Sequence, residues 1–359
     1  MSWCGLAVAA AAAALAAPPE GRSVVLVTTD GLRWQEVFAG ADERLINKEN
    51  GVGEPDEVRK AFWRETPEAR REALLPFLWT VVAREGQLYG NRARGSSVRV
   101  TNGLNFSYPG YNELLTGAAD PRIDSNDKRP NPNVTVLEWL DGREAYRGRV
   151  AAFCSWDVFP FIINRERSHV TVNAGFEPVA DAGRSDLAML NRLLGDTTPV
   201  ETGVRHDSFT FAAALEHVRA RQPRVLYLGL GETDEWAHAK RYDRYLEAAH
   251  RVDRFLGELW RELQARDGYR GRTSLVVTVD HGRGEGPEWK DHGKKVAASQ
   301  DIWIAVVGPE TPALGEQSGV EPVTQAQVAA TVAALLGEDY VAAVPGAAPP
   351  IARAVEGPR

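Results

Sequence analysis

The stretch that decides the fold is Leu275-Val276-Val277-Thr278-Val279-Asp280-His281-Gly282, a short apolar run that ends in a carboxylate and an imidazole. Two other apolar runs have a similar form: residues 24–29 end at Asp30, and residues 225–230 are closely followed by Asp234. Short β-branched apolar runs bounded by Gly and polar residues are typical of buried strands. Open parallel sheets build their sites at the carboxyl ends of strands, so we expect these aspartates to converge.

Strand-like and helix-like segments alternate along the chain, which predicts βαβ units, a mostly parallel central sheet and a three-layer α/β/α fold. Further strands are expected at residues 97–101, 150–153 and 302–307. Helical spacing of apolar residues predicts helices within residues 68–85, 111–115, 208–221, 239–266 and 324–336, and Pro109 is expected to stop any helix before it.

The domain prediction is a single α/β domain over residues 22–340. Residues 118–135 are rich in Asp, Asn, Pro and Arg, and residues 157–205 lack clean periodicity. We interpret the region 118–205 as a cap inserted over the site, because long non-periodic segments in compact enzymes are often lids. The Ala-, Pro- and Gly-rich residues 341–359 are expected to form a loose tail.

Composition excludes several classes of function. The chain has 359 residues, 43% hydrophobic and 25% charged, with a formal net charge of −7. This is ordinary globular composition, and the negative charge argues against binding to a nucleic-acid polymer or to an anionic membrane. An acidic enzyme still binds an anionic substrate where metal ions supply the local positive charge.

The N-terminus has the pattern of a secretory signal peptide over residues 1–16. An Ala-rich apolar run ends near Ala14-Leu15-Ala16, a small-x-small cleavage pattern, and the run is too short to span a bilayer. No Lys or Arg precedes the run, so an uncleaved Ala-rich tail is the alternative. Export places the mature chain in the periplasm or outside the cell. Cleavage would leave Cys154 as the only cysteine and no internal disulfide.

Aspartate and histidine recur at spacings that suit a metal site. Asp234 and His238 are four residues apart, which puts both on one face of a helix, and His292 follows His281 by eleven residues. A capping Asp with a surface His, or an Asp-Gly turn at Asp30, explains any one of these motifs alone. Taken together, carboxylates and imidazoles at strand ends suggest divalent metal ions, Zn²⁺ first and Mn²⁺ second.

The ordered set of motifs resembles the alkaline phosphatase superfamily of metallohydrolases. The nearest branches are the type I phosphodiesterase/nucleotide pyrophosphatase group and its phosphoglycerate-mutase-like relatives. The resemblance runs from about Val24 to Val307, and it implies an alkaline phosphatase-like fold and a small phosphorylated substrate.

In that superfamily a Ser or Thr nucleophile lies between the first Asp and the later clusters, and the stretch from Asn105 to Gly117 is similar to that element. The resemblance implies that Ser107 attacks phosphorus and forms a covalent phospho-intermediate. A hydroxyl bound to a dication can lose its proton, and the following helix N-terminus favours a phosphoryl oxygen. As an isolated motif, Ser107 would more often be a helix cap.

Carried over residue by residue, the resemblance implies two divalent metal ions. One would bind Asp30, Ser107, Asp280 and His281, and the second would bind Asp234, His238 and His292. Asn126 resembles the asparagine that hydrogen-bonds phosphate in the phosphodiesterase branch, although a turn Asn is an equal alternative.

Two departures keep other functions open. Tyr111 stands where sulfatases carry an Arg, which argues against a formylglycine sulfatase. The short spacing to His292 is more similar to the mutase-like relatives, which puts a nucleotide substrate in doubt. A phosphomutase-like phosphotransferase, a sulfatase and a non-catalytic binding protein are therefore the alternatives, in that order.

Other residues near the motifs are expected to be structural. Three tryptophans are expected in core or lid packing rather than stacked on a substrate ring, and five cations are expected on the solvated surface rather than on phosphate. These residues are Trp34, Trp156 and Trp236, and Arg33, Arg283, Lys290, Lys294 and Lys295.

Overall fold

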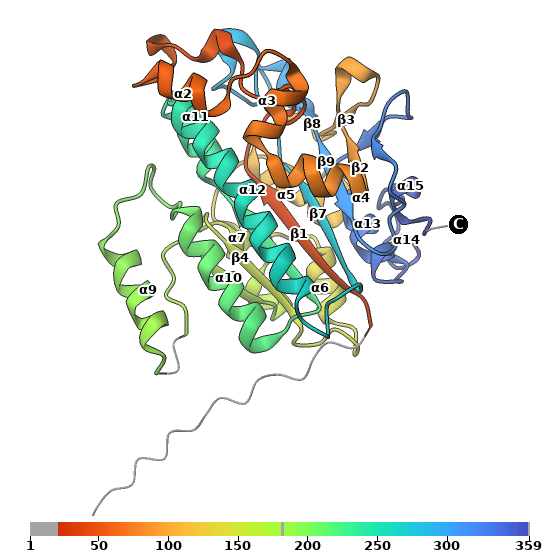
Figure 1. Cartoon of the computed structure of the whole chain (residues 1–359). Helices are drawn as coiled ribbons and strands as arrows, with labels where there is room; N and C mark the ends of the chain where they lie inside the picture. The colour runs from red at the N-terminus through yellow and green to blue at the C-terminus, as the bar shows by residue number, and fades with distance from the viewer. Residues whose placement is uncertain (1–20, 181–182, 358–359) are drawn as a thin grey trace, which may run out of the picture.

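A large sheet runs through the centre of the molecule (Figure 1). The computed structural model describes residues 21–180 and 183–357. Within this part the sheet has eight strands in the order β10-β2-β9-β7-β1-β6-β4-β5. Their bounds are β1 Ser23–Thr29, β2 Gly86–Tyr89, β4 Val150–Cys154, β5 Thr171–Ala174, β6 Val225–Leu230, β7 Thr273–Thr278, β9 Ile304–Val307 and β10 Gly315–Glu316.

The sheet is mostly parallel, as predicted. Strands β5, β4, β6, β1 and β7 run parallel to one another, whereas β9 is antiparallel to both β7 and β2. Every residue of β1, β6 and β7 is buried, which explains why these three strands are near-continuous apolar runs. A separate small sheet joins β11 (Val323–Thr324), β3 (Val98–Arg99) and β8 (Asp301–Ile302).

Helices cover both faces of the sheet. In Figure 1, α10 and α12 cross the front of the sheet, while α5, α6 and α13 pack with one another behind it. The helices are α1 Trp34–Ala39, α2 Pro55–Phe62, α3 Pro67–Leu74, α4 Ala83–Glu85, α5 Ser107–Thr116, α6 Val136–Asp141, α7 Phe159–Ile162, α8 Arg165–Ser168, α9 Ser185–Asp196, α10 Asp207–Arg221, α11 Glu232–His238, α12 Tyr242–Gln264, α13 Gln327–Leu335, α14 Tyr340–Ala343 and α15 Ala352–Val355. The three-layer α/β/α prediction is confirmed.

Two helix predictions need correction, and both concern proline. The helix expected over 68–85 is broken after α3, because Leu75 precedes Pro76 and leaves the helical region, and a π-helical turn, η3 (Leu78–Val82), follows before α4. Pro109 does not stop a helix. It lies in the first turn of α5, where the backbone N–H groups have no partner within the helix. A proline is therefore tolerated there, and α5 begins at Ser107.

The region 118–205 is only partly separate from the sheet. It supplies β4 and β5, which form one edge of the central sheet, so a cap role can concern only the remaining segments. The tail after Tyr340 is not loose over residues 341–357. Helices α14 and α15 pack on or beside α13, and Ile351 and Ala354 are buried, because apolar Ala and Ile side chains in this segment meet the apolar surface of α13.

The N-terminal signal expected at residues 1–16 lies outside the described residues. In the part of the chain that the structure describes, no helix combines the length and the apolar character needed to cross a bilayer.

Candidate active site

The site lies at the carboxyl edge of three adjacent strands. Strand β1 pairs with β6 on one side and β7 on the other, all in parallel, so their carboxyl ends meet. Asp30 directly follows β1, α11 follows β6 and carries Asp234, and Asp280 comes two residues after β7. The convergence expected from the three apolar runs is therefore observed.

The first cluster contains Asp30, Asp280 and His281. The His281 Nε2 atom lies 3.3 Å from Asp30 Oδ1 and 3.4 Å from Asp280 Oδ2. On the other side of the ring, Nδ1 lies 2.9 Å from the carbonyl oxygen of Gly282, which favours a proton on Nδ1 and turns Nε2 toward the carboxylates. The backbone N–H of Gly31 donates to Asp280 Oδ1 at 3.2 Å and holds the second carboxylate in place.

The second cluster contains Asp234, His238 and His292. Asp234 Oδ2 lies 3.1 Å from His238 Nε2, which confirms that the four-residue spacing puts both side chains on one face of α11. His292 Nε2 lies 3.1 Å from His238 Nε2 and 3.9 Å from Asp234 Oδ1. Two separate sequence motifs, one with Asp234 and His238 and one with His292, therefore meet here.

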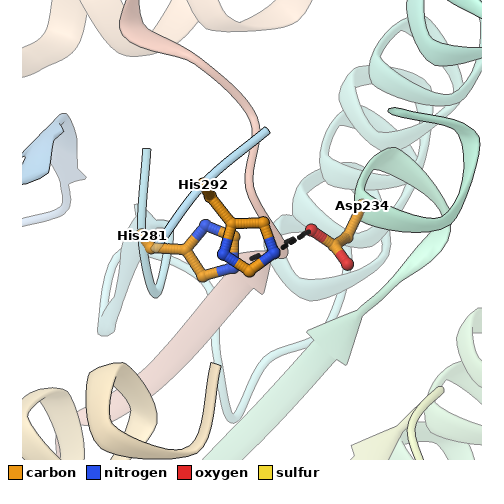
Figure 2. Close-up of side chains that lie close together, drawn as sticks. All are labelled: Asp234, His281 and His292. Carbon is orange, nitrogen blue, oxygen red and sulfur yellow. Dashed lines mark ion pairs between the residues drawn. The ribbon is translucent and has the colours of Figure 1, made fainter. Parts of the chain in front are cut away.

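The two clusters touch through their histidines. The rings of His281 and His292 stack with centroids 3.9 Å apart and an interplanar angle of 11°. Figure 2 shows both rings beside Asp234, and the His281 Nε2 atom lies 3.8 Å from Asp234 Oδ1. His281 thus faces both clusters, whereas the family resemblance implies that it binds one metal ion.

The polar atoms of the first cluster fit a cation. Asp30 Oδ1, Asp280 Oδ2 and His281 Nε2 are buried and have no hydrogen-bond partner among the described residues. Such atoms are costly to bury unless a ligand satisfies them. Carboxylate oxygens and imidazole nitrogens are the donors that Zn²⁺ and Mn²⁺ accept. The described residues form two groups suited to hold a metal ion: Asp30, Asp280 and His281, and Asp234, His281 and His292.

The electrostatics of the site also require positive charge. Burial, together with the charge of Asp30, raises the pKa of Asp280 well above its ordinary value. Burial lowers the pKa of His281, but the carboxylates of Asp280 and Asp30 outweigh burial and raise this pKa to about 9. Burial and the neighbouring His281 lower the pKa of His292. A proton on His281 therefore supplies the charge that a bound cation would otherwise supply.

Ser107 is the first residue of α5 and lies beside these clusters. The Tyr111 hydroxyl, one turn further along α5, donates to Asp30 Oδ2 at 2.9 Å and ties the helix to β1. Asn126 Oδ1 accepts the backbone N–H of Tyr108 at 3.0 Å, so this asparagine caps the amino end of α5. That contact agrees with the structural alternative for Asn126, while the residue also lines the cavity described next.

A cavity of about 170 Å³ opens over the site. Six of the eight sequence-predicted site residues line it, and the other two, Asp280 and His281, are fully buried beneath. The lining residues are Asp30, Ser107, Asn126, Trp156, Glu201, Thr202, Val204, Gly231, Asp234, Glu235, His238 and His292.

The family model for type I phosphodiesterase / nucleotide pyrophosphatase matches residues 46–332. The chain belongs to this family. The predicted resemblance is confirmed, and the protein is a phosphoester hydrolase of the alkaline phosphatase superfamily, whose members depend on metal ions. A search of curated proteins found no match.

Solved structures agree on the fold of this phosphodiesterase-family protein. The phosphonate monoester hydrolase SpPMH from Silicibacter pomeroyi is 13% identical with a TM-score of 0.59, over 93% of this chain and 76% of that one. The wild-type alkaline phosphatase PafA is 12% identical with a TM-score of 0.58, over 94% of this chain and 100% of that one. A putative sulfatase from Bacteroides thetaiotaomicron is 12% identical with a TM-score of 0.56, over 95% and 75%.

Several residues of this family member differ from their sequence expectation. Arg33 and Arg283 are fully buried rather than solvated: Arg33 pairs with Glu36, and Arg283 contacts Asp234 Oδ1 and donates to the Gly31 carbonyl at 3.1 Å. Trp156 lines the cavity. Glu201 and Glu235 also line the cavity, and neither is among the site residues expected from the sequence. The sequence offered one indication, which is that Glu235 directly follows Asp234.

Proposed function

We propose that this protein hydrolyses a phosphoester outside the cytoplasm through Ser107 as nucleophile and two divalent metal ions. The observation that supports this most directly is the set of unpartnered, buried carboxylate and imidazole atoms beside the residue that begins α5. Asp30, Asp280 and His281 would hold one ion together with the Ser107 hydroxyl. Asp234, His238 and His292 would hold the other. Zn²⁺ fits this donor set best, and Mn²⁺ is second.

Bound cations would supply Lewis acidity and lower the pKa of the hydroxyl or water in contact with them. The chain itself supplies position. Ser107, at the amino end of α5, lines the cavity, and the positive potential of this helix end would favour a phosphoryl oxygen there. The Tyr111–Asp30 hydrogen bond fixes the helix against the cluster.

The reaction proceeds in two displacements. Ser107 Oγ loses its proton, forms a bond to phosphorus and displaces one ester oxygen, which leaves as the alcohol after it gains a proton. Water then forms a bond to phosphorus, the bond from phosphorus to Ser107 Oγ breaks, and the serine hydroxyl regains a proton. Negative charge develops on the phosphoryl oxygens in both displacements. The groups that would stabilise this charge lie at the carboxyl ends of β1, β6 and β7.

The test is hydrolysis of p-nitrophenyl phosphate and bis-p-nitrophenyl phosphate. Chelator-stripped protein reloaded with Zn²⁺ or Mn²⁺ is compared with Ser107→Ala, which we expect to lower kcat by about a thousandfold or more. Ser318→Ala, at an exposed serine between β10 and β11, is the matched control and should keep full activity. Equal turnover by Ser107→Ala would remove the nucleophile assignment, and the preferred ester would separate monoesterase from diesterase.

Export and the cap belong to the same proposal. Residues 1–16 would direct the chain to the periplasm or the medium, and the part of residues 118–205 that lies outside β4 and β5 would border the substrate. Amino-terminal sequencing of the secreted protein checks the first point: a mature chain that begins shortly after Ala16 is expected, and an intact Met1 in the cytoplasm would contradict it.

A further inference from the structure

One wall of the cavity is acidic and aromatic. Trp156, Glu201 and Glu235 lie on it, and we call these three residues the acidic wall. Among the described residues that line the cavity, none is a lysine or an arginine. A site for a substrate with several phosphates would be expected to offer such cations to the additional charges.

Glu235 is the central residue of the acidic wall. Its position after Asp234 on α11 turns it toward the cavity, and only 6% of its surface is exposed. Its Oε2 atom has no hydrogen-bond partner among the described residues. A buried carboxylate oxygen without a partner costs stability, so its retention points to a ligand group that satisfies it.

An antiparallel bridge between Trp156 and Val204 holds the remainder of the acidic wall in place. Asp157 donates its backbone N–H to the carbonyl of Gly203 at 2.9 Å, and Arg205 donates to the carbonyl of Ser155 at 3.0 Å. These bonds flank Trp156 and fix the short segment that carries Glu201 beside the carboxyl end of β4. The acidic wall is therefore a preformed surface rather than a free loop tip.

We propose that the acidic wall binds a small alkylammonium group on the substrate, so that the preferred substrates are phosphoesters of amino alcohols or of their quaternary analogues. Carboxylates pair with the positive charge, and an indole face attracts a quaternary ammonium through its quadrupole. The same carboxylates repel additional phosphates, which disfavours pyrophosphate and nucleoside polyphosphate substrates. The cavity volume of about 170 Å³ restricts the group to a small one. This inference rests on the proposed function.

The experiment compares two esters that differ only in charge. p-Nitrophenyl phosphorylcholine carries a trimethylammonium group, and p-nitrophenyl 3,3-dimethylbutyl phosphate carries the uncharged tert-butyl group of the same shape. The metal-loaded protein should hydrolyse the cationic ester with a kcat/KM about fivefold or more above its carbon isostere. Glu235→Gln should reduce this ratio toward one, mainly through a higher KM for the cationic ester.

Glu144→Gln is the matched control, because Glu144 is exposed in the turn before β4, at the opposite end of the strands. It should leave the ratio unchanged. Similar kcat/KM values for the two esters with wild-type protein, lost in Ser107→Ala, would overturn the ammonium proposal while the hydrolase proposal stands. If neither ester turns over, calorimetric titration of the metal-loaded protein with choline and with 3,3-dimethylbutanol decides: choline binding that Glu235→Gln removes supports the acidic wall, and no binding overturns it.

Discussion

His206 fixes the end of the segment that carries Glu201 and Val204, two residues that line the cavity. Its Nδ1 atom lies 2.8 Å from Glu232 Oε1 at the start of α11, and its Nε2 atom lies 3.2 Å from the carbonyl oxygen of Thr198. The hydrogen bond to Glu232 raises the pKa of His206, although burial opposes it. The ionised pair thus links the chain that carries Glu201 to the helix that carries Asp234.

This pair makes protein stability depend on pH. Because the folded-state pKa of His206 is raised above that of the unfolded chain, about 6.5, its contribution is complete below that pH and is lost as pH rises through the folded-state pKa. His206→Gln should lower the free energy of unfolding by about 1 kcal/mol at pH 5.5, with a smaller difference at pH 9. Urea denaturation at both values checks this, and an equal difference at both would show that His206 acts only through packing.

At the scale of single residues, the sequence reveals side chains whose chemistry stands out in a motif. Asp30, Asp280 and His281 are found because each follows an apolar strand, and the sheet then brings them together. Glu201 and Arg283 are not found in this way. Glu201 reaches the cavity only through backbone bonds between distant segments, and burial of Arg283 depends on the Gly31 carbonyl of another strand end. These contacts join segments that are far apart in the chain, so they leave no recognisable pattern in the local sequence.

Helix α5 must approach the aspartate–histidine turn very closely. Gly110 lies in its first turns, and a Cβ atom at this position would overlap the backbone carbonyl of Asp280. The absence of a side chain therefore allows the amino end of α5, with Ser107, to rest against the loop that holds the first cluster. This contact is a condition for the nucleophile and the cluster to share one cavity.

Gly110→Ala should separate these two elements. We expect it to lower the free energy of unfolding by about 2 kcal/mol and to reduce phosphoesterase activity more than tenfold, because α5 or the Asp280 backbone must shift. Gly195→Ala in α9 is the matched control, since nothing lies within 4 Å of its Cβ position. It should be neutral or slightly stabilising in urea denaturation. Full activity in Gly110→Ala would mean that the close approach is not needed.

At the scale of elements, the order of strands and helices is predictable, and their interruptions are less so. The runs before Asp30 and Asp280 predict β1 and β7 because buried parallel strands are apolar throughout. Apolar spacing does not specify where a helix begins or ends. It therefore misses the break between α3 and η3 and the place of Pro109 inside α5. The packing of the tail on α13 depends on a surface made by distant segments.

The whole molecule concentrates negative charge at one edge of its sheet. Asp30, Asp234 and Asp280 all lie there, and the fully buried Arg283 contacts one of them. Burial of like charges without a compensating cation lowers stability, so metal ions that bind the folded state but not the unfolded chain should raise the melting temperature.

Chelation should therefore lower the Tm by about 5 °C or more, and Zn²⁺ or Mn²⁺ should restore it.

The Asp280→Asn variant separates the effect of the metal ion from the effect of the buried carboxylate. It removes the carboxylate whose pKa burial and Asp30 raise, so its metal-free form should melt at or above the wild-type metal-free form, while its response to added metal should be largely lost. Thermal scans of both proteins with and without metal test this. A Tm that is insensitive to chelator in the wild type, despite measurable phosphoesterase activity, would show that the cluster is stabilised by protons and hydrogen bonds rather than by bound cations.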